Sequence, residues 1–151
     1  LYNRSFYTEE MNRLERSPLR PVSCIFLDMN GLKEVNDSLG HDVGDGLLRR
    51  MGGILNQLIQ NTLYSASRIG GDELVVLLPG ADEAALHNCL QSLQELLHVD
   101  NQFYASQPIS LAIGYATVKE NERIEEMLKR ADHMMYQQKQ QYYAQYDRRA
   151  R

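Results

Sequence analysis

The pattern of hydrophobic and polar residues predicts a domain that mixes strands and helices. Residues 22–27 are almost entirely apolar, which is typical of a short strand buried on both faces. Residues 64–69 and 73–78 are two further apolar segments on either side of a glycine pair, and this arrangement predicts a hairpin. Residues 110–118 have a similar character and are expected to return as another strand.

Helices are expected where apolar residues recur at intervals of three and four positions. Residues 5–17 form a polar helical segment, and further helices are expected after the turn at residues 36–45, after Asp82 and from Glu122. Asp82 is suited to cap its helix. The order β-α-α-β-β-α-β predicts an α+β fold in which two helices cross one face of a central, mainly antiparallel sheet.

Composition is that of one globular domain. The chain has 151 residues, of which 43% are hydrophobic, so it can bury a substantial core. Its net charge of −4, from 16 basic and 20 acidic residues, argues against general attraction to nucleic acid or to an anionic membrane. Cys24 and Cys89 lack metal-ligand spacing and are expected to be buried thiols in a reducing compartment. No apolar run is long enough to span a membrane.

Acidic residues interrupt the apolar segments at the ends of strands. Asp28 ends the first strand, and Asp72 and Glu73 follow Gly70 and Gly71 at the tip of the hairpin. The glycine pair predicts a type I′ or II′ turn, because glycine tolerates positive φ. If the first strand lies beside the hairpin, Asp28 and Asp72 converge, and such oxygen ligands suit Mg²⁺ or Mn²⁺. Taken alone, either acid is better explained as a solvated turn residue.

The segment from residue 36 to residue 45 gathers amide, carboxylate and imidazole groups with two glycines. A carboxylate can accept hydrogen bonds from N1–H and the exocyclic amine of guanine, and an amide can meet donors as well as acceptors. This mixture is suited to reading the edge of a purine. Taken alone, Asn36 and Asp37 are better explained as helix caps.

Several stretches together resemble the GGDEF family of bacterial diguanylate cyclases. They are residues 28–45, the motif Gly70-Gly71-Asp72-Glu73-Leu74, residues 110–116 and residues 131–139. In the motif, Leu74 stands where the family most often has Phe and is expected to point inward. The resemblance spans most of the chain, and the fold it implies is shared with nucleotidyl cyclases and the polymerase palm.

The resemblance implies an enzyme that condenses two GTP molecules into cyclic di-GMP and pyrophosphate. Metal ions assist the attack of each 3′-hydroxyl on the α-phosphate of the other GTP, across a homodimer. Two alternatives remain: a catalytically inactive regulatory domain that binds GTP, and a purely structural dimerisation module. The module would leave the acidic residues unexplained.

The resemblance also assigns residues to the metal and to catalysis. Asp28, the carbonyl group of Met29 and Asp72 would bind Mg²⁺ or Mn²⁺, with Glu73 as a candidate ligand of a second ion. Asp72 also matches the family's proposed proton acceptor, and Glu73 would assist deprotonation. Asp72 and Glu73 are therefore the expected catalytic residues.

Substrate contacts follow from the same resemblance. Asn36 and Asp45 match the residues that read guanine, and an acid at position 45 favours guanine over adenine. The phosphates would be held by the backbone N–H groups of Gly31 and Leu32 and by the side chains of two lysines, Lys33 and Lys139. For a lone lysine a solvated surface charge is the ordinary explanation, but the sequence that precedes Lys139 supports this role.

Some positions depart from the family pattern. Asn30 replaces an acid that many members have near the metals. Tyr142 and Tyr143 occupy the place where a phosphate-binding Arg is common, and Arg148 or Arg149 are candidate substitutes. Each departure puts one contact to the metal or the phosphates in doubt.

The resemblance also bears on the larger protein and its regulation. Residues 1–151 are expected to be a single GGDEF domain, and residues 1–4 are similar to the tail of the family's N-terminal signature, so an upstream sensory or dimerising region is expected. A cytoplasmic domain is expected, with membrane anchoring of the full-length protein left open. Residues 61–64 lack the Arg-x-x-Asp motif for product inhibition, so no feedback by cyclic di-GMP is expected there.

Overall fold

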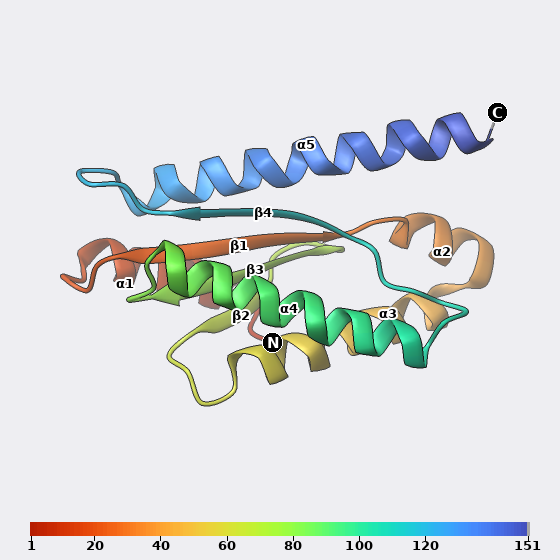
Figure 1. The fold of residues 1–151 in the computed structure, drawn as a ribbon, viewed down its shortest axis with the longest axis horizontal. Coiled ribbons are helices and arrows are strands. Elements are labelled where there is room, and N and C mark those ends of the chain that lie inside the picture. The colour runs from red at the N-terminus through yellow and green to blue at the C-terminus, as the bar shows by residue number, and fades with distance from the viewer. Residues whose placement is uncertain (151) are drawn as a thin grey trace.

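The computed structural model describes the backbone of residues 1–150 and the side chains of residues 1–146. Four strands form one sheet in the order β2-β3-β1-β4, and each neighbouring pair is antiparallel (Figure 1). The strands are β1 (Val22–Met29), β2 (Ser65–Arg68), β3 (Glu73–Pro79) and β4 (Leu111–Thr117). The predicted α+β fold with an antiparallel sheet is confirmed.

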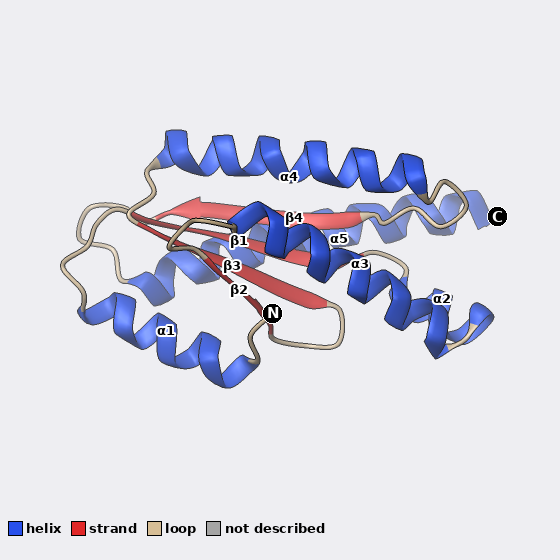
Figure 2. Cartoon of the chain, turned by 90° about the horizontal axis from the view of Figure 1, so that it is seen from below, coloured by secondary structure: helices blue, strands red, loops and turns tan. Residues whose placement is uncertain are grey.

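Helices cover both faces of this sheet (Figures 1 and 2). The pair α3 (His41–Ile59) and α4 (Glu83–Phe103) lies on one face, and α1 (Arg4–Arg16) and α5 (Ile124–Ala150) lie on the other. The prediction of two helices on one face holds for α3 and α4 but missed the layer opposite. The short helix α2 (Leu32–Leu39) lies beyond the end of β1. Within residues 1–150, no helix is long and apolar enough to cross a membrane.

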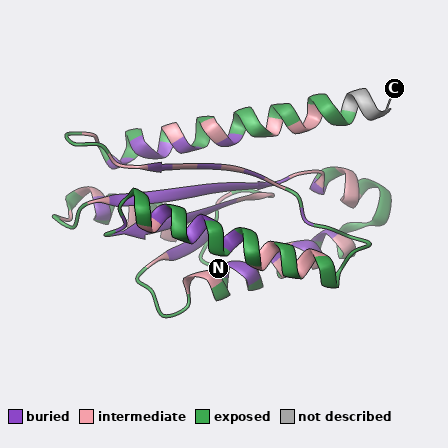
Figure 3. Cartoon of the chain, viewed as in Figure 1, coloured by how far each residue is buried: buried purple, intermediate pink, exposed green. Residues whose placement is uncertain are grey.

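Strand β1 runs through the middle of the molecule, and all eight of its residues are buried (Figure 3). Its side chains alternate between the two cores, because successive residues of a strand point to opposite faces. Ile25 and Leu27 pack in the core under α3 and α4, whereas Cys24 and Phe26 pack in the core under α5. By the same alternation, Asp28 points toward α5.

Helix α5 packs directly against the backbone of β4. A Cβ atom on Gly114 would lie 1.9 Å from the carbonyl oxygen of Ala131 and 2.5 Å from the amide nitrogen of Met135. Only a glycine leaves room for this approach. The contact places the helix along the sheet, and beyond it α5 continues over the segment that follows β1 (Figure 1).

The turn between β2 and β3 differs from the predicted type I′ or II′ turn. Neither Gly70 nor Gly71 has a positive φ, and the loop closes through a 3.0 Å bond from the N–H of Ile69 to the carbonyl of Glu73. The side chain of Arg68 donates to both glycine carbonyls, at 2.7 Å for Gly71. The prediction is wrong because the loop is longer than two residues and a side chain supports it.

Residues 36–45 do not form a single turn. Helix α2 already includes Asn36 and Asp37, and Gly40 alone separates α2 from α3. Neither Asn36 nor Asp37 caps a helix, so that interpretation is wrong. The capping role predicted for Asp82 is confirmed, since its side chain accepts a 2.8 Å bond from Ala85 N–H at the start of α4.

Candidate active site

Two acidic residues meet at one lysine at the end of the sheet. The Lys139 ammonium donates a 2.9 Å hydrogen bond to Asp28 Oδ2 and lies 3.8 Å from Asp72 Oδ2. Asp28 belongs to β1, Asp72 to the hairpin loop and Lys139 to α5, so three separate elements supply the cluster. The predicted convergence of Asp28 and Asp72 is confirmed.

Backbone hydrogen bonds hold the two acidic segments together. Met29 N–H donates to the carbonyl of Asp72 at 3.0 Å, which joins the end of β1 to the hairpin loop. Asn30, the residue that departs from the family pattern, is tied to the start of β4. Its N–H donates to the Ser110 carbonyl at 2.8 Å, and its side-chain amide donates to Ser110 Oγ at 3.1 Å. The loop after β1 is therefore fixed on both sides.

Unsatisfied polar atoms gather around this loop. Five buried side-chain atoms among the described residues have no hydrogen-bond partner, and four of them belong to residues 28–36: Asp28 Oδ1, Asn30 Oδ1, Glu34 Oε2 and Asn36 Oδ1. Buried polar atoms are nearly always paired in native proteins, so an exception needs an explanation. Their concentration in one segment is what a binding site for a polar ligand requires.

The electrostatics of the cluster favour a cation. Burial raises the pKa of Asp28 from 3.8 to about 6, against the hydrogen bond from Lys139 and with a contribution from the charge of Asp72. Burial acts to lower the pKa of Lys139, but the hydrogen bond and charge of Asp28 outweigh it and raise that pKa. The Asp28 carboxylate is thus costly to ionise with a single ammonium as its partner.

The side chain of Glu73 has different neighbours from those of Asp28 and Asp72. It pairs with Asp28 in the strand register, and its side chain lines a cavity of about 240 Å³ with Arg4 and Asp132. Burial raises the pKa of Glu73, and the charges of Asp132 and Asp72 add to that effect. No three Asp, Glu, His or Cys side chains among those described converge as a metal-binding group. Glu73 therefore does not form a single three-residue metal-binding group with Asp28 and Asp72.

The N-terminus of α2 presents backbone N–H groups beside the cluster. Gly31 is its N-cap with φ of +74°, and no side chain caps the helix. The first intrahelical bond runs from Val35 N–H to the Gly31 carbonyl, so the N–H groups of Leu32 and Lys33 have no acceptor within the helix. Such a helix start attracts anions. The side chain of Leu32 is buried, whereas that of Lys33 is exposed.

Asn36 is held against α3 by a close contact at Gly44. A Cβ atom on Gly44 would lie 1.8 Å from Asn36 Oδ1, so the amide group occupies the space that a larger residue would fill. Asp45 is the next residue of α3 and is exposed. Asn36 and Asp45 line the same cavity of about 340 Å³, together with Leu32, Lys33 and Asp72 among others. The two expected guanine readers and two of the expected phosphate contacts thus share one cavity with an acid of the cluster.

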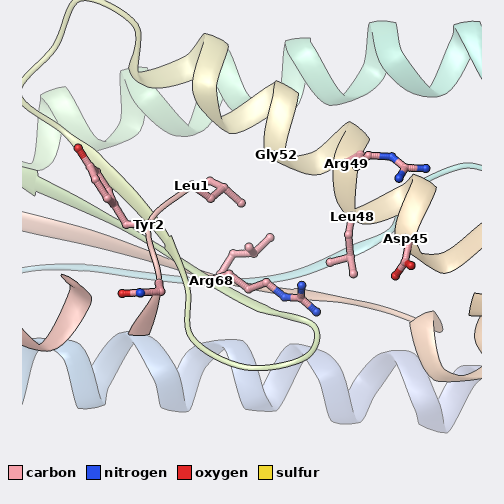
Figure 4. Close-up of a pocket in the computed structure, with 9 residues that line it drawn as sticks. Leu1, Tyr2, Asp45, Leu48, Arg49, Gly52 and Arg68 are labelled. Carbon is pink, nitrogen blue, oxygen red and sulfur yellow. The ribbon is translucent and has the colours of Figure 1, made fainter. Parts of the chain in front are cut away.

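A second cavity, of about 590 Å³, adjoins the first, because Asp45, Leu48 and Arg68 line both. In Figure 4, the side chain of Arg68 extends from β2 toward Leu48 and Asp45 on α3, and Leu1 lies over Gly52. The N-terminal residues are attached to the sheet, since Tyr2 N–H donates to the Ala66 carbonyl at 3.0 Å. The two cavities together run along α3 from α2 to the start of the chain.

Two tyrosines of α5 lie over the α2 N-terminus. The Gly31 N–H donates to the hydroxyl oxygen of Tyr143 at 3.4 Å, and the Tyr142 hydroxyl lies 3.3 Å from the point where a Gly31 Cβ would be. Tyr143 therefore takes one amide that was expected to bind phosphate. The candidate substitutes Arg148 and Arg149 lie outside the residues whose side chains are described.

The sequence did not reveal several residues that shape the site. Gly44 positions Asn36, Gly114 positions α5, and Arg68 supports the hairpin loop while it lines both cavities. Arg68 lies two residues before Gly70, and this nearness to the motif could have marked it as a site residue. Nothing in the local sequence marks Gly44 and Gly114, because the need for a missing Cβ appears only when segments distant in the sequence meet.

Comparison with known proteins identifies the family. The family profile described as "Diguanylate cyclase, GGDEF domain" matches residues 1–145. The chain is 33% identical over 142 residues to diguanylate cyclase DgcS of Shewanella oneidensis, covering 92% of this chain and 47% of that protein. It is 32% identical over 150 residues to the response regulator PleD of Caulobacter vibrioides, covering 92% of this chain and 32% of PleD. The chain therefore spans less than half the length of either relative.

Solved structures agree on the fold. The GGDEF domain and coiled coil of DgcB from Caulobacter crescentus, solved in complex with c-di-GMP, superimposes with a TM-score of 0.79 at 21% identity. That alignment covers 93% of this chain and 77% of the DgcB chain. The profile match, the curated relatives and the shared fold all agree with the motif at residues 70–74, and the chain belongs to the GGDEF diguanylate cyclase family.

Proposed function

We propose that this domain is a diguanylate cyclase, which joins two GTP molecules into cyclic di-GMP and releases pyrophosphate. The observation that carries the proposal is the meeting of Asp28 and Asp72 beside a cavity that also holds Asn36, Asp45 and the α2 N-terminus. Groups suited to a metal, to phosphates and to a purine edge are thus arranged in that order along one surface. The relatives' names, which include several diguanylate cyclases, support the same activity.

The guanine base is assigned to Asn36 and Asp45. The Asp45 carboxylate accepts from the N1–H and exocyclic amine of guanine, and adenine would leave it without a donor at N1. Asn36 lines the cavity, and its buried Oδ1 has no hydrogen-bond partner among the described residues, so the amide has unused hydrogen-bonding capacity for the base. A site built to satisfy such groups discriminates strongly against a base that leaves them unpaired.

The phosphates are assigned to the start of α2. Leu32 and Lys33 line the same cavity as Asp72, Gly31 precedes them as the N-cap of α2, and the positive end of the helix favours the negative charge of phosphates. We assign the phosphates to the N–H groups of Gly31 and Leu32 and to the ammonium of Lys33. Because Tyr143 accepts from Gly31 N–H, that amide must exchange the phenol oxygen for a phosphate oxygen on binding.

The donor set near Lys139 fits a divalent metal ion. Asp28 Oδ1 is buried and unpartnered, and the carboxylate of Asp72 lies on the same ammonium, so two hard oxygen ligands already point to one place. The Met29 carbonyl is proposed as a further ligand, and Glu73 as a ligand of a second ion. When bound, Mg²⁺ or Mn²⁺ would lower the pKa of the 3′-hydroxyl and neutralise charge on the phosphates. We assign the acceptance of that hydroxyl's proton to the Asp72 carboxylate.

One domain supplies one such site, so catalysis requires two copies that face each other. The attacking 3′-hydroxyl and the α-phosphate then belong to GTP molecules held by different domains. We therefore propose a homodimer, brought together by an upstream sensory or dimerising segment of the full-length protein, in a cytoplasmic setting. The protein then contributes alignment of nucleophile and phosphorus as well as charge stabilisation.

A second candidate is a catalytically silent domain that binds GTP and regulates. The observation that favours it is Tyr143, which stands where a phosphate-binding Arg is common and occupies Gly31 N–H. A phenol supplies no positive charge to the triphosphate. Its presence would therefore impair the alignment of the α-phosphate more than the binding of GTP.

Mass spectrometry of the reaction products separates the two candidates. The domain is fused to a constitutive dimerising coiled coil and incubated with GTP and Mg²⁺, with Asp72→Ala as the control. Cyclic di-GMP that forms with the wild-type fusion and disappears with Asp72→Ala supports the cyclase. Bound but unconverted GTP identifies the silent regulator, and the absence of any GTP binding rejects both.

A further inference from the structure

Among the residues whose side chains are described, Lys139 is the one cation in contact with the two acids that the proposed function assigns to a metal. Its ammonium lies 2.9 Å from Asp28 Oδ2 and 3.8 Å from Asp72 Oδ2, and its side chain is 30% exposed. The side chain of Asp28 is only 1% exposed, and its second oxygen has no partner among the described residues. In this state the lysine alone compensates the buried charge of Asp28.

A buried carboxylate needs such a compensating charge. An ionised group without a partner is strongly destabilising, and removing one member of a buried pair leaves the other uncompensated. Lys139 reaches this position because α5 is fixed to β4 at Gly114 and then passes over the end of β1. The pair therefore has a structural role in the metal-free protein.

The same geometry prevents a metal ion and the ammonium from sharing these carboxylates. Mg²⁺ binds its oxygen ligands at about 2.0–2.1 Å. An ion on Asp28 Oδ1 and Asp72 would lie only a few ångströms from an ammonium that stayed on Asp28 Oδ2. The two would repel each other strongly, because like charges at such a separation interact by several kcal/mol in a partly buried site. One cation must leave when the other binds.

We propose that Lys139 is a built-in counter-ion, which holds the carboxylates of Asp28 and Asp72 in place without metal and is displaced when a divalent cation binds there. The displaced ammonium is then free to contact a nucleotide phosphate. This inference rests on the proposed function and adds a competition between lysine and metal for one pair of acids. Lys139 is thus a positioning residue in the metal-free protein and a substrate contact once metal has bound.

The test compares Lys139→Met with Lys129→Met. Methionine keeps the unbranched apolar stem of the lysine side chain, is one atom shorter, and removes the charge. Lys129 lies on the same helix, is exposed and has only a 3.8 Å ion pair with Glu125, so its substitution controls for charge removal from α5. Binding of Mn²⁺ is measured by isothermal titration calorimetry without nucleotide, and thermal unfolding is measured with and without Mn²⁺.

Lys139→Met should bind Mn²⁺ about tenfold more tightly than the wild type, since one competing charge is gone. Without metal it should melt at a lower temperature, and Mn²⁺ should raise its melting temperature more than that of the wild type. Lys129→Met should match the wild type in both. If Lys139→Met is unfolded without metal, recovery of its circular dichroism spectrum on adding Mn²⁺ supports the inference, and failure to recover overturns it.

A double variant removes both partners. Lys139→Met with Asp28→Asn should regain the metal-free melting temperature that Lys139→Met loses, and should no longer respond to Mn²⁺. Unchanged or weaker Mn²⁺ binding by Lys139→Met overturns the inference. If the wild type binds GTP with Mn²⁺ in that case, only the inference fails. If the wild type binds neither Mn²⁺ nor GTP, the proposed function fails with it.

Discussion

At the scale of single residues, Asp28 combines full burial with a negative charge. Burial raises its pKa from 3.8 to about 6, so the folded protein binds a proton there more readily than the unfolded chain does. A carboxyl group whose pKa is raised in the folded state destabilises that state at pH values above the raised pKa. This destabilisation disappears at pH values below the pKa of the same group in the unfolded chain. Stability without metal should therefore fall as the pH rises from about 4 to about 6.

This pH dependence is measurable against Asp28→Asn. A shift from 3.8 to about 6 corresponds in full to about 3 kcal/mol, and part of it is already present at pH 4, so the wild type should lose about 2 kcal/mol relative to the variant between pH 4 and pH 7.5. Denaturant unfolding at both pH values, without divalent metal, measures the difference. Lys139 and Asp72 are the other ionisable groups that influence the pKa of Asp28, and both are present in the wild type and in the variant. A difference that does not change with pH would contradict the assigned burial penalty.

Asn36 offers a second test at this scale, through Gly44. Gly44→Ala would put a Cβ atom 1.8 Å from the present position of Asn36 Oδ1, so the amide must move away from its position against α3. Loss of one hydrogen bond to guanine costs about 1–1.5 kcal/mol, so the affinity for GTP should fall about tenfold. Calorimetric titration with GTP measures this change.

The matched control for that substitution is Gly46→Ala. Gly46 lies on the same helix, and a Cβ atom there meets nothing within 4 Å. Alanine at this position should leave GTP binding unchanged and stabilise α3 by about 1 kcal/mol. If both variants bind GTP with equal affinity, the assignment of Asn36 to the guanine site is wrong.

At the scale of elements, the sequence indicates the strands and helices well and their junctions poorly. The continuous burial of β1 follows from its apolar run, and the meeting of Asp28 and Asp72 follows from acids placed at adjacent strand ends. The start of α2 did not follow, because Gly31 begins the helix before the polar residues that suggested a turn. The position of Lys139 beside both acids depends on how α5 packs against the sheet, and no local sequence pattern predicts that packing.

The packing of α5 can be tested at Gly114. Alanine there would overlap the backbone of Ala131 and Met135, and backbone atoms cannot move aside as a flexible side chain can. Gly114→Ala should destabilise the protein by about 1–3 kcal/mol or more, as overpacking does. Gly53→Ala, with open space around the new Cβ, is the control and should be neutral or stabilising. Chemical denaturation of both variants measures the difference, and equal stabilities would refute the close contact.

At the scale of the whole molecule, the proposed reaction needs two domains. If each domain binds one GTP as proposed, a dilute isolated domain should produce cyclic di-GMP at a rate that rises with the square of enzyme concentration. A fusion held as a permanent dimer should show a rate linear in concentration. Initial rates of pyrophosphate release over a tenfold dilution series distinguish the two, and a linear rate for the isolated domain would argue for catalysis by single copies or by a pre-formed dimer.

Helix α5 connects the interior of the protein to its acidic centre. Its first part packs in the core over β4 at Gly114, and its later part carries Lys139 and Tyr143 over the loop after β1. Exchange of the lysine for a divalent ion would therefore release one polar attachment of this continuous rod, while its buried half stays fixed and Tyr143 keeps its bond to Gly31 until a phosphate takes that amide. Ion and nucleotide would thus loosen α5 in two separate steps, and a spectroscopic probe on the exposed Tyr146 could read each step without touching the nucleotide.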